Sequence, residues 1–180
     1  SMNNPTFTVT PKALDFVAKI AEAVGELQGS GEYARNLRLR KVNRLRSIQS
    51  SLAIENNSLS IDEVADIING KRVFGAPNEI QEVKNAYKAY EHLLQYNPYS
   101  VDDFLKAHQY MTEGLVNNSG KFRSKGVGVY AGDQLIHAGA KADFVPGLIA
   151  DLLAWGQASD VHPLIKSCNM HFEIEFIHPF

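Results

Sequence analysis

The segment from Pro163 to Phe176 carries apolar side chains on nearly all of its faces. At about 100° per residue, its apolar residues point in almost every direction around a helix axis. These residues are Leu164, Cys168, Met170, Phe172, Ile174 and Phe176. A helix that is apolar all round is normally the buried central helix of a domain. The sequence therefore predicts a helical domain assembled around this segment.

Most of the remaining chain is also patterned for helices. Apolar residues recur three and four positions apart, and capping residues or prolines precede several of these runs. The strongest start signals are Pro11, Pro77, Pro163 and the capping box from Ser60 to Glu63. The predicted helices cover approximately residues 11–28, 33–54, 61–69, 77–94, 101–115, 143–155 and 163–176.

One strand signal stands among these helices, between Val127 and Ile136. Gly132 and Asp133 lie in its middle and form a suitable two-residue turn. This pattern predicts a single β-hairpin. The predicted fold class is therefore all-α with one hairpin.

The composition fits a compact globular protein of 180 residues, with 44% hydrophobic and 21% charged residues. A net charge of -2 provides no general attraction to nucleic acid or to anionic membranes. With Cys168 as its one cysteine, the chain cannot hold an internal disulfide or a cysteine-based zinc site. No signal peptide and no apolar run of about 18 residues is visible, so we expect a cytoplasmic protein with no membrane partner.

The chain ends in His178, Pro179 and Phe180. This ending resembles the start of the signature of the Fic (filamentation induced by cAMP) domain family, HPF-x-(D/E)-G-N-G-R. The later residues of the signature do not occur in this sequence. The resemblance implies a mainly helical Fic fold whose C-terminal part is absent from the chain.

The resemblance extends upstream over roughly Leu37 to Phe180. It includes a core helix with His108, the Gly-x-Phe-Arg sequence at 120–123, and the hairpin, which resembles the family's flap. The segment Ser51–Asn56 matches the family's inhibitory motif, (S/T)-x-x-x-E-(G/N). The chain thus resembles the subclass that is inhibited from its own N-terminal side. We predict an N-terminal helical region at 1–97 with the inhibitory helix, and an incomplete Fic core at 98–180.

The resemblance implies that His178 is a catalytic general base, with Pro179 and Phe180 completing its motif. The implied enzyme is a protein adenylyltransferase that transfers AMP from ATP to a Ser, Thr or Tyr hydroxyl of a target protein. Histidine suits this role because its ordinary pKa of about 6.5 leaves it neutral and still basic near pH 7. ATP and Mg²⁺ are the implied cofactors, and the metal ligand is expected beyond residue 180. We therefore expect the polypeptide alone to be inactive and the 163–176 helix to be partly uncovered in it.

The resemblance also assigns an inhibitory site and a target site. Ser51 and Glu55 are four residues apart and share a helix face. Glu55 would occupy the space and charge that the ATP γ-phosphate needs, supported by Ser51, with Asn56 as the last motif residue. An extended target segment would dock along the flap. The target could be the protein itself, in auto-AMPylation, and a homo-oligomer is a separate possibility. The flap residues are Val127, Gly128, Val129, Tyr130, Leu135 and Ile136.

Several alternatives remain open at this stage. A Fic protein can transfer another phosphate-containing group or remove AMP, and His178 could simply cap a helix end. His171, Glu175 and His178 have spacings that suit a zinc site. A non-catalytic nucleic-acid or protein-binding helical module is also possible, because basic residues are dense between Arg35 and Arg46. Nucleic acid is disfavoured, since these residues are spread around the helix without an aromatic platform.

Overall fold

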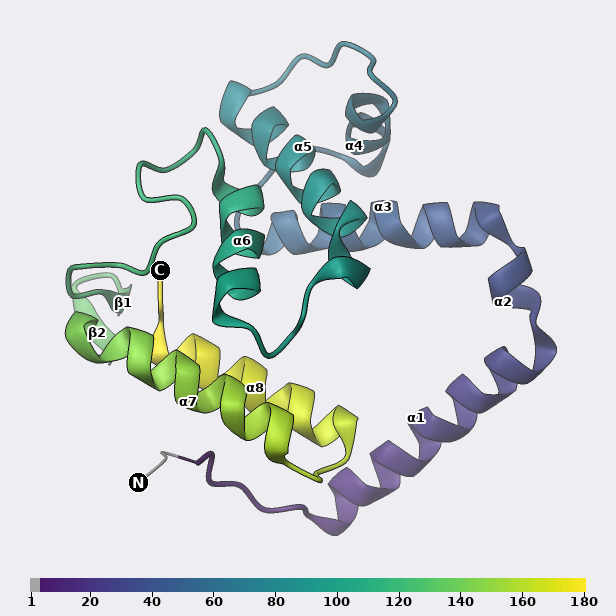
Figure 1. The fold of residues 1–180 in the computed structure, drawn as a ribbon. Helices are drawn as coiled ribbons and strands as arrows, with labels where there is room; N and C mark the ends of the chain where they lie inside the picture. The colour runs from purple at the N-terminus through teal and green to yellow at the C-terminus, as the bar shows by residue number, and fades with distance from the viewer. Residues whose placement is uncertain (1–3) are drawn as a thin grey trace. The chain divides into compact units, whose positions relative to one another are not determined.

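The computed structural model describes residues 4–180. Over these residues the protein is mostly helical, with one antiparallel hairpin (Figure 1). No helix in this part of the chain is both long and apolar enough to cross a bilayer. The predicted fold class is confirmed. The helices are α1 (Pro11–Ser30), α2 (Glu32–Arg35), α3 (Leu37–Ile54), α4 (Ile61–Ile68), α5 (Pro77–Glu91), α6 (Val101–Thr112), α7 (Val145–Ala158) and α8 (Pro163–Ile177), with 3-10 turns at Leu93–Gln95 and Ala142–Phe144.

Side-chain caps begin the helices where the sequence predicts them. In α1 the Thr10 hydroxyl oxygen accepts a hydrogen bond from the Ala13 amide at 3.1 Å. The capping box of α4 is complete: Ser60 Oγ accepts from the Glu63 amide at 3.2 Å, and Glu63 Oε2 accepts from the Ser60 amide at 2.8 Å. Each cap satisfies backbone N–H groups that lack a partner inside the helix.

The predicted helix from residue 33 to residue 54 is wrong as a single element. It is interrupted at Asn36, whose backbone is not helical (φ -90°, ψ 85°). The Asn36 side chain accepts a hydrogen bond from the Leu39 amide at 2.9 Å and so begins α3 as a new helix. A short amide side chain competes with the backbone for such hydrogen bonds, which is why asparagine favours helix starts over helix interiors.

The chain forms two compact units. The first unit contains the residues up to Val17, Tyr96–His108 and Gly120–Phe180. The second contains Ala18–Gln95 and Gln109–Ser119. The domain boundary expected after residue 97 stays a prediction.

In the second unit, α3, α4 and α5 pack against one another. Their apolar faces form one core, which contains Ile48, Leu52, Leu59, Val64, Ile67, Val83 and Ala86. The loop after α3 is tied to α5 by the buried Asn57, whose Nδ2 donates to the Glu79 carbonyl at 3.2 Å and to Glu82 Oε2 at 2.7 Å. The end of α3 is therefore held in a defined position within this unit.

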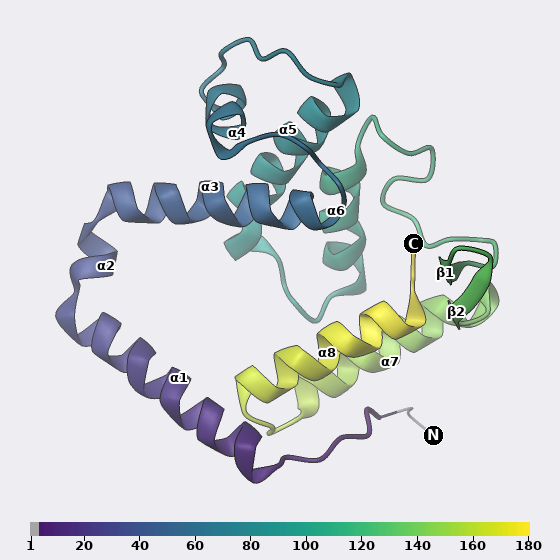
Figure 2. The ribbon, with the colours of Figure 1, turned by 180° about the vertical axis from the view of Figure 1, so that it is seen from behind.

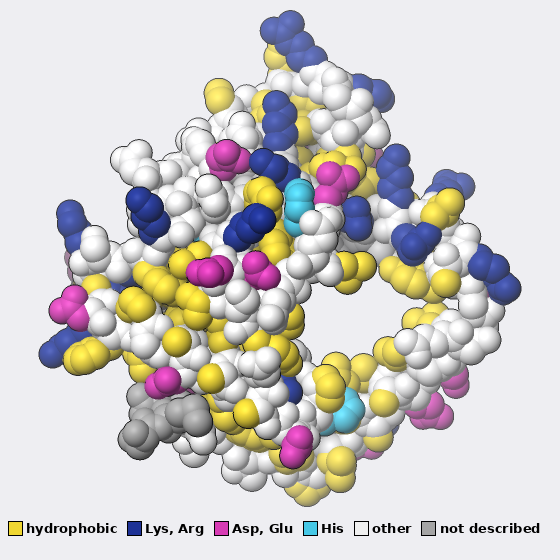
Figure 3. Space-filling model, viewed as in Figure 1, with side chains coloured by type: hydrophobic (Ala, Val, Ile, Leu, Met, Phe, Trp, Pro, Cys, Tyr) yellow, Lys and Arg dark blue, Asp and Glu magenta, His cyan; other side chains and the backbone are white. Residues whose placement is uncertain are grey.

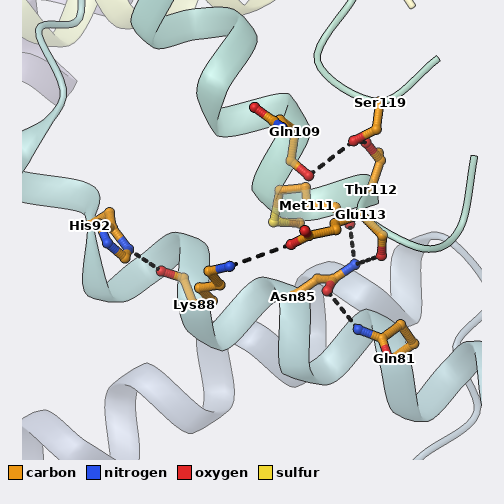
Figure 4. Close-up of polar contacts among 9 residues, drawn as sticks. All are labelled: Gln81, Asn85, Lys88, His92, Gln109, Met111, Thr112, Glu113 and Ser119. Atoms are coloured by element: carbon orange, nitrogen blue, oxygen red, sulfur yellow. Dashed lines mark hydrogen bonds and ion pairs between the residues drawn. The ribbon is translucent and has the colours of Figure 1, made fainter.

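A second buried amide in this unit closes the C-terminal end of α6 (Figure 4). Asn85 Nδ2 donates to the carbonyls of Met111 at 3.2 Å and Glu113 at 2.9 Å, and its Oδ1 accepts from Gln81 Nε2 at 2.9 Å. The last carbonyls of a helix have no partner within it. Asn85 supplies that partner from α5, and an ion pair of 3.4 Å between Lys88 and Glu113 lies beside it.

In the first unit, α7 and α8 lie side by side (Figures 1 and 2). Their contact buries Val145, Ile149, Leu152, Leu153 and Ile177. The apolar pattern of α8 is not matched by burial on all sides among residues 4–180. Ile177 is its one buried residue in this part of the chain, while Phe172 and Phe176 are 61% and 54% exposed. Since α7 covers one face of α8, the helix is partly uncovered, as we expected for this chain.

The predicted hairpin is confirmed. Strand β1 (Gly128–Ala131) pairs with β2 (Gln134–Ala138) in antiparallel fashion, with a bulge between Val129 and Tyr130. The turn between the strands contains Gly132, whose φ of 60° is a conformation that glycine adopts at little cost. The second strand extends two residues beyond the predicted end.

Candidate active site

His178 ends α8 in an unusual backbone conformation. It is the C-cap residue, its amide donates to the Ile174 carbonyl at 2.9 Å, and it has φ 55° and ψ 69°. A residue other than glycine in this left-handed region costs roughly 1–2 kcal/mol. The proline at 179 disfavours continuation of the helix. The conformation is maintained by contacts from elsewhere in the first unit.

Arg123 makes the most extensive of these contacts. Its side chain is 7% exposed, and its Nε donates to the His178 carbonyl at 2.5 Å. Its Nη2 donates to the Ile177 carbonyl at 3.2 Å, and its own amide donates to the Pro179 carbonyl at 3.0 Å. The same guanidinium donates to two further carbonyls, those of Lys125 and Ala140. Arg123 therefore binds the end of α8 and the two chain segments that flank the hairpin.

Gly139 allows the base of the hairpin to approach this site closely. A Cβ atom there would lie 2.8 Å from Val127 Cγ1, 2.9 Å from Arg123 Nη2 and 3.2 Å from His178 Cβ. Real Cβ atoms essentially never approach other heavy atoms within 3.0 Å, so a larger residue here would force the Val127 side chain and the hydrogen-bonded Arg123 guanidinium to shift. Sequence reasoning missed Gly139, and a glycine just after a strand is only a weak signal of such an approach.

Phe180 is anchored in a stack of aromatic rings. The His108 ring lies parallel to it, with centroids 3.6 Å apart and 8° between the planes. Phe104 and Phe122 also stack with it, at 5.5 Å and 5.9 Å. His108 Nδ1 lies 3.0 Å from the Gly120 amide and accepts its hydrogen, so this nitrogen carries no proton. The aromatic stack and the Arg123 bonds together determine where the chain runs on both sides of Pro179.

The acceptor role of His108 predicts a pH dependence of stability. Burial lowers the pKa of His108 below 6.5. The unfolded chain therefore binds more protons than the folded chain below about pH 6.5, so the stabilisation is complete above that value and is lost as the pH falls. Urea unfolding measures this effect. We expect the free energy of unfolding to fall less between pH 7.5 and pH 5.5 in His108→Gln than in the parent. His171→Gln, on an exposed residue of α8, serves as the control, and equal losses in all three proteins would contradict the assignment.

The imidazole of His178 is open to other molecules. Among residues 4–180 it has no hydrogen-bond partner, and it lines an open hollow of about 170 Å³ together with Ile174, Glu175 and Phe180.

Two alternative roles for His178 lack support in this structure. The His178 side chain does not bind the last carbonyls of the helix, because Arg123 donates to the carbonyls at this helix end instead. The zinc interpretation with His171 is not supported either, since the described residues contain no group of three or more His, Cys, Asp or Glu that could hold a metal ion.

The hairpin is tied to the same helix end. His137 Nε2 lies 2.7 Å from the Phe176 carbonyl, and the Ala140 amide donates to the Ile177 carbonyl at 3.2 Å. Val127 precedes β1, and its carbonyl accepts from the Gly139 amide at 3.0 Å. Of the predicted flap residues, Gly128, Val129 and Tyr130 lie in β1, and Leu135 and Ile136 lie in β2. Apart from Gly128, these strand residues are exposed: Val129, Tyr130, Leu135 and Ile136.

The motif at Ser51–Asn56 lies at the C-terminal end of α3 in the second unit. Ser51 is in the last turn of the helix, Glu55 is its C-cap residue, and both are exposed. The Asn56 amide donates to the Ala53 carbonyl and the Asn57 amide to the Leu52 carbonyl. These two bonds form a Schellman motif, which requires a left-handed residue at the position of Asn56, and its φ is 67°. The pattern accepts either Gly or Asn at this position because both residues tolerate a positive φ.

This geometry predicts how substitutions at Asn56 behave. Glycine adopts a positive φ freely, so Asn56→Gly should change the free energy of unfolding by less than about 0.5 kcal/mol. Asn56→Val should destabilise the protein by roughly 1–2 kcal/mol, because a β-branched residue is strained there. Urea unfolding of the three proteins measures both effects. Equal stability of the valine variant would show that the loop relaxes out of this conformation.

Comparison with known proteins identifies what these features resemble. Residues 98–180 match the model of the Fic/DOC family. The chain is 47% identical to a Fic family protein from Desulfovibrio desulfuricans G20, with a TM-score of 0.92, over 98% of this chain and 55% of that one. A search of curated proteins gave no match.

Two more distant structures share the fold. A Fic domain-containing signaling protein from Bacteroides thetaiotaomicron has a TM-score of 0.73 at 17% identity, over 87% of this chain and 65% of that one. Fic-1 from C. elegans has a TM-score of 0.70 at 20% identity, over 95% and 54%. The chain thus spans about half to two thirds of the length of these structures. From the matched residues and the close structural relative, the chain belongs to the Fic/DOC family.

Proposed function

We propose that the whole protein is a protein adenylyltransferase in which His178 is the general base. The observation that supports this most directly is the accessible imidazole of His178 on a backbone held by Arg123. In the proposed reaction the imidazole takes the proton from a target hydroxyl. The hydroxyl oxygen then bonds to the α-phosphorus of ATP, the bond from that phosphorus to the bridging oxygen breaks, and pyrophosphate leaves. AMP remains on the target as a phosphodiester.

His178 and its neighbours contribute positioning to this reaction. A general base must lie within hydrogen-bond reach of the proton that it removes. Arg123 and the stacked Phe180 restrict the backbone on both sides of the imidazole, which limits the directions in which it can point. The proposed reaction uses Mg²⁺ to neutralise phosphate charge. Residues 4–180 offer no cluster for such a metal, so we assign no step of this chain to it.

The hairpin is the proposed docking site for the target protein. Among residues 4–180, β1 and β2 form a two-stranded sheet. Each strand of such a sheet pairs with its neighbour along one edge only. An extended peptide can add to such an edge through main-chain hydrogen bonds, which require little sequence consensus. His137 and Gly139 connect the hairpin to the end of α8, so a peptide bound there would lie in the same unit as His178.

We further propose that Glu55 restrains the activity. Its exposed carboxylate lies at a helix end that the Schellman motif and Asn57 hold in place within the second unit. A negative charge in the space that a phosphate group needs repels that phosphate, and solvent screens this repulsion in part because the carboxylate is exposed. Removal of that carboxylate should therefore favour productive binding of ATP.

Radiolabelled ATP tests both parts of this proposal. We expect the whole protein to incorporate label from the α-phosphate of ATP and not from the γ-phosphate. Glu55→Gln should raise incorporation roughly tenfold or more, equivalent to about 1.4 kcal/mol, while Glu26→Gln in the exposed part of α1 should leave it unchanged. Incorporation of label from the γ-phosphate would show that the protein transfers phosphate and not AMP. An unchanged rate in Glu55→Gln would remove the inhibitory role.

A further inference from the structure

The second unit contains a pocket beside the N-terminal half of α3. One wall is a single face of that helix, formed by residues at positions i, i+3, i+4, i+7 and i+8 from Leu37. The other walls are the C-terminal end of α4, with Ile68 and Asn69, and Tyr87 from α5. The volume is about 350 Å³, which is within the range of sites that bind small molecules.

The pocket is strongly basic. Helix α3 contains five Lys and Arg residues and no Asp or Glu, and three of the five line the pocket: Arg40, Lys41 and Arg44. In the part of the chain that the structure describes, none of these three side chains makes a hydrogen bond or an ion pair. Figure 3 shows Lys and Arg side chains gathered toward the N-terminal end of α3, at the right of the view. The expectation that the basic residues lack a common face is therefore only partly correct.

The remaining lining is apolar and aromatic. Leu37, Leu45 and Ile68 contribute aliphatic surface, and the half-buried ring of Tyr87 lies near Arg44. The pKa of Tyr87 is raised, chiefly by its hydrogen bond to the side chain of Glu91. Glu91 is an acidic group close to the pocket, but it does not line it. The ring of Tyr87 thus stays neutral and offers a face for stacking.

We propose that this pocket binds a nucleoside phosphate. Arg and Lys side chains bind phosphate oxygens through charge-assisted hydrogen bonds. A base requires an apolar slot with a flat surface, and the Tyr87 ring, with the aliphatic side chains beside it, provides one. Three cations and a ring around 350 Å³ match both parts of such a ligand. This site lies in the second unit and does not depend on the proposed role of His178.

Nucleic acid fits these observations less well. A duplex is bound by a row of cations along an exposed face, and single strands are bound by a series of aromatic platforms. Here the cations converge on a concavity with one ring, and the chain as a whole has a net charge of -2. A small ligand can therefore contact all three cations and the ring of this pocket at once, which a nucleic acid polymer does less well.

Calorimetric titration of the 180-residue chain with ATP, AMP and pyrophosphate tests this site. We expect Arg40→Gln combined with Arg44→Gln to weaken ATP binding tenfold or more. The matched control is Arg38→Gln combined with Arg46→Gln, which removes the same charge from the same helix outside the pocket, and we expect less than a twofold change.

Four outcomes would overturn the proposal. The first is that neither nucleotide binds. The second is an equal loss of ATP affinity in both double variants, which would mean that ATP is attracted by the overall positive charge of the helix and not by the pocket. The third is pyrophosphate binding as tightly as ATP, which would exclude recognition of the nucleoside. The fourth is a short DNA duplex that binds more tightly than ATP and is weakened only by the pocket variant, which would reassign the site to nucleic acid.

Discussion

Arg123→Met is expected to destabilise the first unit by about 3–5 kcal/mol. Removal of the guanidinium takes the donor from the His178 carbonyl at the end of α8 and from the Lys125 and Ala140 carbonyls beside the hairpin. The Ile177 carbonyl keeps its hydrogen bond from the Ala140 amide. Each buried carbonyl that is left without a donor costs about 1–3 kcal/mol. Water that enters the site recovers part of this loss, so the total remains below the sum of the individual bonds. The effect is large because one side chain serves several segments.

Trp155 provides the measurement for Arg123→Met. It is the one tryptophan of the sequence and lies in α7 of the first unit, so its fluorescence follows the unfolding of that unit. For a chain of 150–250 residues each kcal/mol corresponds to about 2–4 °C, so the melting temperature should fall by on the order of 10 °C. Lys121→Met, which removes an exposed charge two residues from Arg123, is the control and should shift the melting temperature by less than about 2 °C. Similar melting temperatures for both variants would show that the carbonyls find other donors.

The helices were predictable where their ends depend on neighbours in the sequence. The Ser60–Glu63 capping box and the proline at 77 act through contacts within four residues, and both begin helices in the structure. Asn36 also acts locally, but asparagine occurs in helices and at caps alike, so its interruption of the helix was not evident. Burial of α8 depends on which elements cover it, and periodicity alone does not contain that information.

The candidate site was only partly predictable, because its contacts join distant segments. Arg123 is 55 residues from His178, and no spacing rule connects an arginine to the carbonyls of a helix end that far along the chain. Gly139 and His108 became informative only when their neighbours in space were known. The motif resemblance identified the position of His178, and the structure adds a physical reason for its backbone conformation.

His178→Asn is expected to lower the rate of AMP transfer by the whole protein by about 10²–10⁴-fold, the usual contribution of a general base. Asparagine is the preferred replacement because it tolerates the left-handed backbone of this position, whereas alanine would add strain there. It also cannot accept a proton near neutral pH. A loss of activity in this variant therefore reports on proton transfer and not on a distorted helix end.

The initial rate of incorporation from α-labelled ATP gives the magnitude of this effect. His171→Asn, which alters an exposed histidine on the same helix, should retain activity within about twofold of the parent. Thermal unfolding should give similar melting temperatures for both variants, since His178 contributes to its surroundings through its backbone carbonyl, which the substitution keeps. Parent-like transfer by a folded His178→Asn protein would exclude His178 as the base, and the aromatic and arginine contacts around it would then have only a structural role.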